Sequence, residues 1–140
     1  MGAGIAQVAA AARWDVVLSD VSTDVAARAL DRIDKRFSRL VEKGRMSKED
    51  AGAATARIRV ADGDDSFGEC ALVIEAVVED LEAKIASLSR VARAAPADAV
   101  LASNTSSLSV TRIGEGVGAA ERTIGMHFFN PVPLMPLVEV

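Results

Sequence analysis

The alternation of strand-like and helix-like segments is the feature that most constrains how this chain can fold. Short apolar runs occupy residues 15–20, 57–61, 71–77 and 99–104, and residues 123–126 add another. The segments between them place apolar residues at helical spacing, so each strand is followed by a helical crossover. Such crossovers join parallel strands, which predicts an α/β fold. The run 71–77 is typical of a central, buried parallel strand.

One insertion interrupts this alternation. Apolar residues at helical spacing predict a long amphipathic helix that ends at Gly44; they are Ala26, Leu30, Ile33, Phe37, Leu40 and Val41. Ser47, with Asp50 three residues later, predicts the start of a second, shorter helix. The two segments together predict a helical hairpin. Trp14 and Cys70 are interpreted as buried packing residues.

Composition narrows the class of protein. A chain of 140 residues, half of them hydrophobic, can bury one core, so we expect a single domain over residues 1–140. The net charge of −4 leaves no basic surface for nucleic acid or an anionic membrane. No apolar run approaches the roughly 20 residues of a membrane-spanning helix, and no signal-peptide pattern is present. We therefore expect a cytoplasmic protein without nucleic-acid or membrane partners. The single cysteine cannot form an internal disulfide, and together with the one histidine it makes a poor set of metal ligands.

The stretch MGAGIAQVAA at residues 1–10 has the form of a broken nucleotide-binding motif. Dinucleotide folds open with a strand and then G-x-G-x-x-G, in which the last glycine lets the helix pack on the strand. Only Gly2 could be that last glycine, so the first strand would lie upstream of residue 1. A glycine pair near a terminus is also often incidental.

Asp20 ends the next predicted strand, where an acidic residue binds the ribose hydroxyls of adenosine. It could equally be a turn or helix-capping aspartate. In the first interpretation, its charge repels a 2′-phosphate and favours NAD over NADP. Gly2 and Asp20 together indicate a Rossmann-like, doubly wound, mostly parallel sheet with the hairpin inserted and the first strand missing.

Two further stretches carry a specific resemblance: LASNTSSLSVT at 101–111 and GMHFFNPVPLMPLVEV at 125–140. With residues 1–10 and LVIEAVVEDLEAK at 72–84, they resemble the NAD-binding domain of the L-3-hydroxyacyl-CoA dehydrogenases. The likeness is closest to the monofunctional bacterial branch that includes 3-hydroxybutyryl-CoA dehydrogenases. It implies NAD-dependent interconversion of L-3-hydroxyacyl-CoA and 3-oxoacyl-CoA, in fatty acid or butanoate metabolism.

The resemblance also implies parts that these 140 residues do not contain. In the family, the first strand and the first two glycines of the loop precede the position of Met1, which corresponds to a methionine inside the motif. A helical C-terminal domain completes the acyl-CoA cleft and mediates dimerisation. We therefore expect a homodimer for the full-length protein, and little or no turnover from residues 1–140 alone.

His127 and Glu139 are the candidate catalytic pair. Oxidation of a secondary alcohol needs a base for the hydroxyl proton, and histidine suits that task near neutral pH. Glu139 lies twelve residues later, past three prolines that permit the chain to turn back, and its carboxylate could orient the ring. A lone histidine beside two phenylalanines could instead be a core residue. Similarity to the family's His–Glu pair favours the catalytic interpretation.

The resemblance implies further site residues. Ser106 matches the serine that hydrogen-bonds the substrate's 3-oxygen and approaches the nicotinamide, and Asn130 matches an asparagine near the cofactor. Glu79 and Lys84 match a pair that contacts NAD. Each has a plain alternative: a polar turn, an Asn-Pro turn and a solvent-exposed ion pair, respectively.

Lys43 lies in the basic stretch RLVEKGR at 39–45 and is our candidate for contacting the phosphates of coenzyme A. A charged helix face is more commonly just solvated.

Two other functions remain open. A sugar-acid dehydrogenase of the gulonate type is a related alternative, although its histidine motif resembles H-P-V-N-P rather than HFFNP. A non-catalytic remnant is the second, because a sheet without its first strand would expose an edge that invites association with another chain.

Overall fold

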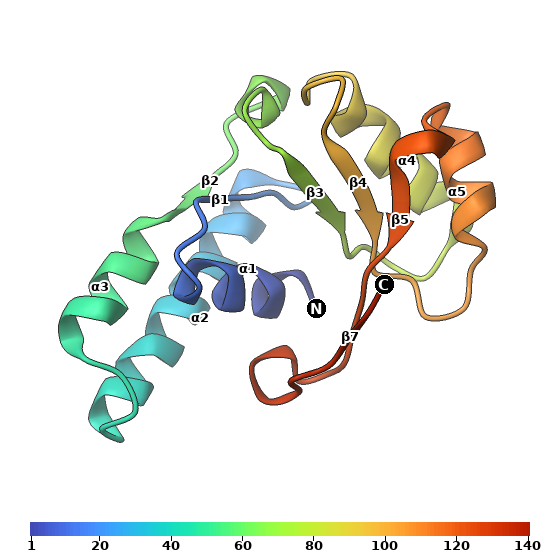
Figure 1. Ribbon diagram of the computed structural model, residues 1–140. Coiled ribbons are helices and arrows are strands. Elements are labelled where there is room, and N and C mark those ends of the chain that lie inside the picture. The colour runs from blue at the N-terminus through green and yellow to red at the C-terminus, as the bar shows by residue number, and fades with distance from the viewer. The chain divides into compact units, whose positions relative to one another are not determined.

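The computed structural model describes residues 1–140 and divides them into two compact units (Figure 1). One unit spans Ala3–Asp62, and the other combines Met1–Gly2 with Gly63–Val140. The single domain over residues 1–140 stays a prediction. The strands form three separate sheets, of which the first two are parallel and the third is antiparallel. Parallel strands joined by helices confirm the predicted α/β class.

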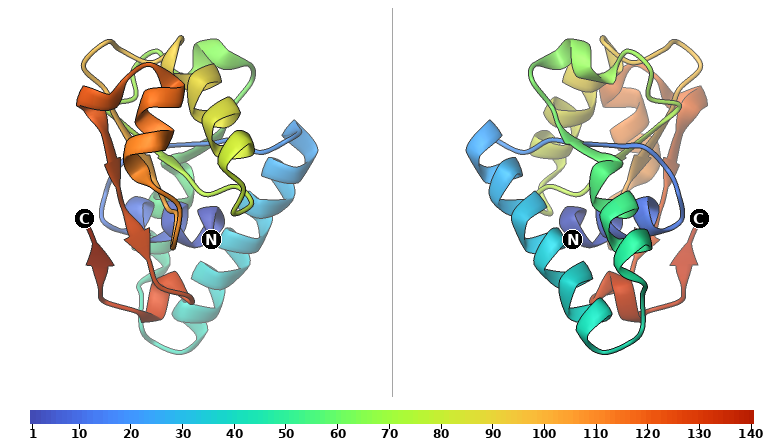
Figure 2. Two further views of the ribbon diagram at one scale, coloured as in Figure 1. Left: turned by 90° about the vertical axis from the view of Figure 1, so that its right-hand side faces the viewer. Right: turned by 90° about the vertical axis from the view of Figure 1, so that its left-hand side faces the viewer.

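The unit Ala3–Asp62 contains the predicted helical hairpin. Helix α1 (Gly2–Ala11) leads to strand β1 (Val16–Leu18), and α2 (Thr23–Glu42) and α3 (Lys48–Ala56) precede β2 (Ile58–Val60). Strands β1 and β2 pair in parallel, with Val16 opposite Ile58. The right-hand view of Figure 2 shows α2 and α3 running side by side.

Local signals fix the ends of the hairpin helices. Ser22 caps α2, and the Ser47 hydroxyl accepts the Asp50 N–H at 2.9 Å at the start of α3. After α2 the chain turns at Gly44, whose φ of 65° favours glycine. The capping and hairpin predictions are therefore confirmed.

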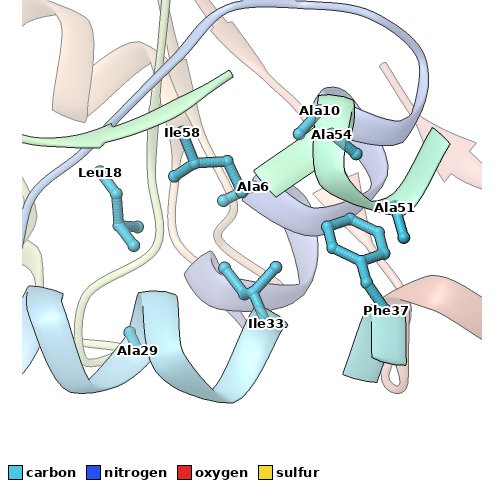
Figure 3. Close-up of a cluster of buried hydrophobic side chains, with 9 residues drawn as sticks. All are labelled: Ala6, Ala10, Leu18, Ala29, Ile33, Phe37, Ala51, Ala54 and Ile58. Carbon is cyan, nitrogen blue, oxygen red and sulfur yellow. The ribbon is translucent and has the colours of Figure 1, made fainter. Parts of the chain in front are cut away.

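The core of this unit consists of small and branched side chains from five elements. Alanines on α1, α2 and α3 let the helices approach one another around Ile33 and Phe37 (Figure 3). The members are Ala6, Ala10, Leu18, Ala29, Ile33, Phe37, Ala51, Ala54 and Ile58.

The packing interpretation of Trp14 was wrong, since its side chain is 66% exposed. The Trp14 N–H bonds to the Ala9 carbonyl at the end of α1, in a turn that holds the residue at the surface. Cys70 is only partly buried. Both residues lie in irregular segments outside the helices and strands, where an apolar side chain can remain outside the core.

The second unit is built on a three-stranded parallel sheet. Its strands are β3 (Leu72–Glu75), β4 (Val100–Ser103) and β5 (Thr123–Gly125), in that order. Helices α4 (Leu81–Ala92) and α5 (Val110–Val117) lie together on one face of it (Figure 2, left). Leu88, Leu101, Ile113 and Ala119 form the buried core between helices and sheet.

Strand β3 is not central in this sheet, contrary to the expectation from its apolar run. It pairs with β4 alone, and Leu72 at its start is 41% exposed. The apolar run predicted the strand correctly but not its place among its neighbours.

The three strands end level with one another. The register pairs Glu75 with Ser103 and Ser103 with Gly125. The segments that follow β3, β4 and β5 therefore leave the sheet from one edge, which is where open parallel sheets place ligands. Beyond β5 the chain continues through β6 (His127–Phe128), turns at η3 (Val132–Leu134) and returns along β7 (Val138–Glu139) (Figure 1).

Two short 3-10 turns complete the second unit, η1 (Asp64–Phe67) and η2 (Ala120–Arg122). None of the helices combines the length and the apolar character that crossing a membrane requires.

Gly114 in α5 packs directly against a neighbouring stretch of backbone. A Cβ there would lie 3.0 Å from the Ala120 Cα and 3.1 Å from the Thr123 Cβ, so the backbone would have to shift. We expect Gly114→Ala to lower the free energy of unfolding by about 1–3 kcal/mol, measured by urea denaturation.

Gly52→Ala is the matched control, because Gly52 lies in α3 with nothing within 4 Å of the new methyl group. That variant should gain up to about 1 kcal/mol from helix propensity. Equal effects of the two substitutions would contradict the packing argument.

Candidate active site

The antiparallel pair β6 and β7 brings His127 and Glu139 together. The two residues are direct cross-strand partners, so their side chains project from the same face. The Nδ1 atom of His127 lies 2.9 Å from Oε2 of Glu139. The predicted pair is therefore in contact, through a hairpin that returns across the proline-rich residues 129–137.

The other ring nitrogen of His127 faces the loop after β4. Its Nε2 lies 3.0 Å from Oγ of Ser106. An ionised carboxylate can only accept, so we assign the ring proton to Nδ1 and the lone pair to Nε2. The Phe129 ring packs at 4.7 Å between ring centroids. With a polar partner on each nitrogen and a quarter of its side chain exposed, His127 is not an ordinary core residue.

Glu79 organises the serine loop. Its Oε1 accepts the Thr105 hydroxyl and the N–H groups of Ser106 at 2.9 Å and Ser107 at 3.1 Å. The Thr105 hydroxyl in turn accepts the Leu108 N–H at 2.9 Å. The hydrogen bond from Thr105, followed by those from Lys84 and the two backbone N–H groups, outweighs partial burial and lowers the pKa of Glu79 to about 2.

Lys84 is fully buried, so the solvent-exposed ion pair considered for Glu79 and Lys84 is wrong. Its Nζ lies 2.9 Å and 3.2 Å from the two oxygens of Glu75, and 3.2 Å from Oε2 of Glu79. Glu75 is itself buried and accepts the Ser103 hydroxyl at 2.6 Å. A buried cation thus contacts two carboxylates, one inside the fold and one at the site.

The sequence interpretation missed Glu75, Ser103 and Asn104. The Asn104 N–H bonds to the Glu75 carbonyl, and Asn104 Oδ1 accepts the Phe128 N–H at 2.8 Å. Asn104 therefore ties the serine loop to the strand that carries His127. The available signal was an acidic residue inside the apolar run LVIEAV, with a lysine nine residues later on the following helix.

Two other predicted site residues have exposed side chains. Asn130 follows β6 and is exposed, and Lys43 is exposed at the C-terminal cap of α2 in the other unit. A Cβ on Gly2 would lie 3.8 Å from the Ala76 Cβ, an ordinary contact, so the packing here does not demand glycine.

Asp20 follows β1 and has an exposed side chain whose Oδ1 accepts the Val21 N–H at 2.7 Å. This is the local turn bond of one of the two interpretations. Ser22, not Asp20, caps α2. The cofactor roles of Gly2, Asp20 and Asn130 stay predictions.

The lowered pKa of Glu79 predicts a pH-dependent contribution to stability. Between about pH 4.5 and 2 the unfolded state binds a proton at Glu79 while the folded state does not, so stability falls as pH falls through this window. Unfolding midpoints from pH 5 to 2 should decline more steeply for the unaltered protein than for Glu79→Gln. Identical slopes would contradict the assignment.

Comparison with known proteins gives a consistent picture. A family model described as "3-hydroxyacyl-CoA dehydrogenase, NAD binding domain" matches residues 1–140. A 3-hydroxybutyryl-CoA dehydrogenase of Bradyrhizobium diazoefficiens is 43% identical over 140 residues, which are 100% of this chain and 48% of that protein. A probable 3-hydroxybutyryl-CoA dehydrogenase of Bacillus subtilis is 40% identical over the same length, 49% of its own chain.

Solved structures agree. The (S)-3-hydroxybutyryl-CoA dehydrogenase of Ralstonia eutropha superimposes with a TM-score of 0.93 at 36% identity, covering 99% of this chain and 49% of that one. The chain spans about half the length of the curated relatives named here. By the match over its whole length, this chain belongs to the 3-hydroxyacyl-CoA dehydrogenase family, as its NAD-binding domain.

Proposed function

We propose that this chain is the NAD-binding, base-carrying part of an enzyme that oxidises L-3-hydroxyacyl-CoA to 3-oxoacyl-CoA. The observation that carries the proposal is the hydrogen-bonded series Glu139, His127, Ser106 at the carboxyl edge of a parallel sheet. Three side chains from two separate segments meet there at distances of 2.9 and 3.0 Å. This is the arrangement that removal of an alcohol proton requires.

Each residue of the series has a role in the proposed reaction. His127 Nε2 takes the proton from the 3-hydroxyl group as the carbon–oxygen double bond forms. Glu139 holds the ring through Nδ1 and stabilises the imidazolium that results. The Ser106 hydroxyl, now directed at Nε2, hydrogen-bonds the reacting oxygen. NAD, when bound, supplies the acceptor for the hydride that leaves the same carbon.

Asp20 fits the requirement for holding such a cofactor. Its carboxylate is exposed at the carboxyl end of β1, and only Oδ1 is engaged, by a neighbouring N–H. An acceptor of this kind binds the ribose hydroxyls of adenosine and repels a 2′-phosphate. We therefore assign NAD rather than NADP, with Gly2 and Asn130 as further contacts and Lys43 as a contact of the coenzyme A phosphates.

Substitution of Asp20 tests the cofactor assignment. In the full-length protein, Asp20→Ala should lower the ratio of kcat/KM for NAD to that for NADP by about tenfold or more, because charged hydrogen bonds to the ribose are lost and repulsion is removed. Asp24→Ala, an exposed aspartate in the first turn of α2, is the control and should leave the ratio unchanged. An unchanged ratio in Asp20→Ala would assign this carboxylate to the turn alone.

The activity itself is tested with the full-length protein. Acetoacetyl-CoA and NADH should give absorbance loss at the nicotinamide band, and replacement of the thioester by a sugar acid should give none. Turnover of the sugar acid instead would favour the gulonate-type alternative. Light scattering of the same sample tests the proposed homodimer of the full-length protein. We also propose that the protein is cytoplasmic.

A further inference from the structure

The carboxylate of Glu75 is buried, and both of its oxygens accept hydrogen bonds. It is 4% exposed and accepts four hydrogen bonds. Lys84 Nζ contacts both oxygens, the Val77 N–H donates to Oε1 at 2.6 Å, and the Ser103 hydroxyl donates to Oε2 at 2.6 Å. Movement of this carboxylate would leave several buried donors unpaired, so its position is tightly held.

Lys84 connects the buried carboxylate of Glu75 to the carboxylate of Glu79 at the site. A buried ammonium needs an anionic partner, and Glu75 supplies one through both of its carboxylate oxygens. The same ammonium then lies 3.2 Å from Oε2 of Glu79. Glu79 is thereby held through one oxygen by a cation that cannot itself move.

The other oxygen of Glu79 holds the loop. Oε1 accepts the Thr105 hydroxyl and the N–H groups of Ser106 and Ser107. The side chain of Ser106 then lies within hydrogen-bond distance of His127 Nε2. The contacts form a continuous series from the buried end of β3 to the proposed catalytic base.

We propose that Glu75 is a positioning residue for the reaction: through Lys84 it fixes Glu79, which holds the Ser106 hydroxyl against His127. The inference rests on the proposed function for its catalytic consequence. Glu75 lies one residue layer behind the site and touches no reacting group, yet a displacement of the Ser106 hydroxyl by about 1 Å can cost 10²-fold in rate. Substitution of Glu75 should therefore lower kcat, and the size of this effect should depend on the presence of Ser106.

A double-mutant cycle in the full-length protein tests this path. Glu75→Gln keeps the shape of the side chain but removes the charge that holds Lys84. It should lower kcat about tenfold when Ser106 is present and less than about twofold in a Ser106→Ala background, because the step it supports is then already lost. The KM for NAD should change little in either background.

A control separates positioning from general destabilisation. Ile113→Val removes one methylene from the buried hydrophobic core of the same unit and should leave kcat unchanged at temperatures well below unfolding. Equal factors for Glu75→Gln in both backgrounds would overturn the proposal, as would no effect in either. If Glu75→Gln does not fold, Ser103→Ala removes a single donor to Glu75 and replaces it in the cycle, with a smaller effect of the same sign.

Amide hydrogen exchange distinguishes this inference from the proposed function. The N–H groups of Ser106 and Ser107 donate to Glu79, so Glu75→Gln should speed exchange in residues 104–108 several-fold, whether or not the protein is active. Absence of turnover in the unaltered protein would refute the dehydrogenase activity. The exchange measurement would then still test whether Glu75 holds the serine loop through Lys84 and Glu79. Unchanged exchange in an active enzyme would refute the link alone.

Discussion

Replacing His127 with alanine in the full-length protein is expected to lower kcat by about 10²–10⁴-fold, the range that a positioned general base contributes. His127 is the only histidine in the chain, and both of its ring nitrogens are engaged, by Glu139 and Ser106. The affinity for NADH, measured by fluorescence titration, should stay within a factor of about two, because this substitution removes a group used in the chemical step.

Glu121→Gln provides a control on the same unit, since it neutralises an exposed carboxylate in η2 away from the site. Its kcat should match that of the unaltered protein. Retained turnover in His127→Ala would remove the histidine from its role. Loss of NADH binding together with turnover would indicate that His127 supports the fold or the cofactor instead.

Replacing Lys84 with methionine is expected to lower the free energy of unfolding by about 3–5 kcal/mol, the cost of leaving a buried charge without its partner. The side chains of Lys84 and Glu75 are each 1% exposed, so water cannot replace the missing ammonium beside Glu75. Urea unfolding followed by circular dichroism measures the loss.

Two variants make that result interpretable. Lys35→Met changes an exposed lysine of α2 and should alter stability by less than about 0.5 kcal/mol. Lys84→Met combined with Glu75→Gln should recover part of the loss, since the unpaired carboxylate is removed. Strict additivity of the two substitutions would show that the buried pair does not interact.

The parts of the fold that the sequence predicted are those with local causes. Ser47 and Gly44 mark the ends of the hairpin helices, because capping and positive φ depend on neighbours within a few residues. The parallel class followed from alternation in the same way. The place of β3 in its sheet did not follow, since an apolar run reports burial and not which strand lies beside it.

The residues of the candidate site also differ in whether the sequence could predict them. His127, Glu139 and Ser106 are of residue types that take part in acid–base chemistry, and the family resemblance implied their roles. Glu75 and Asn104 could not be recognised from type, because their importance lies in a register that sets Glu75 beside Ser103 and in a bond from Asn104 to the Phe128 N–H. The burial of Trp14 was predicted wrongly because hydrophobicity alone does not place a residue in the core, and the segment between α1 and β1 leaves its side chain exposed.

The hairpin formed by β6 and β7 is a separate sheet from the parallel strands β3, β4 and β5. The proposed base and its carboxylate partner lie on one contiguous stretch of chain that extends past the parallel strands. Exchanges at the exposed residues 133–137 can therefore change how the Glu139 carboxylate meets the imidazole while α4, α5 and their strands keep their packing. A library that randomises only residues 133–137 should yield variants that differ in kcat and keep the melting temperature of the unaltered protein.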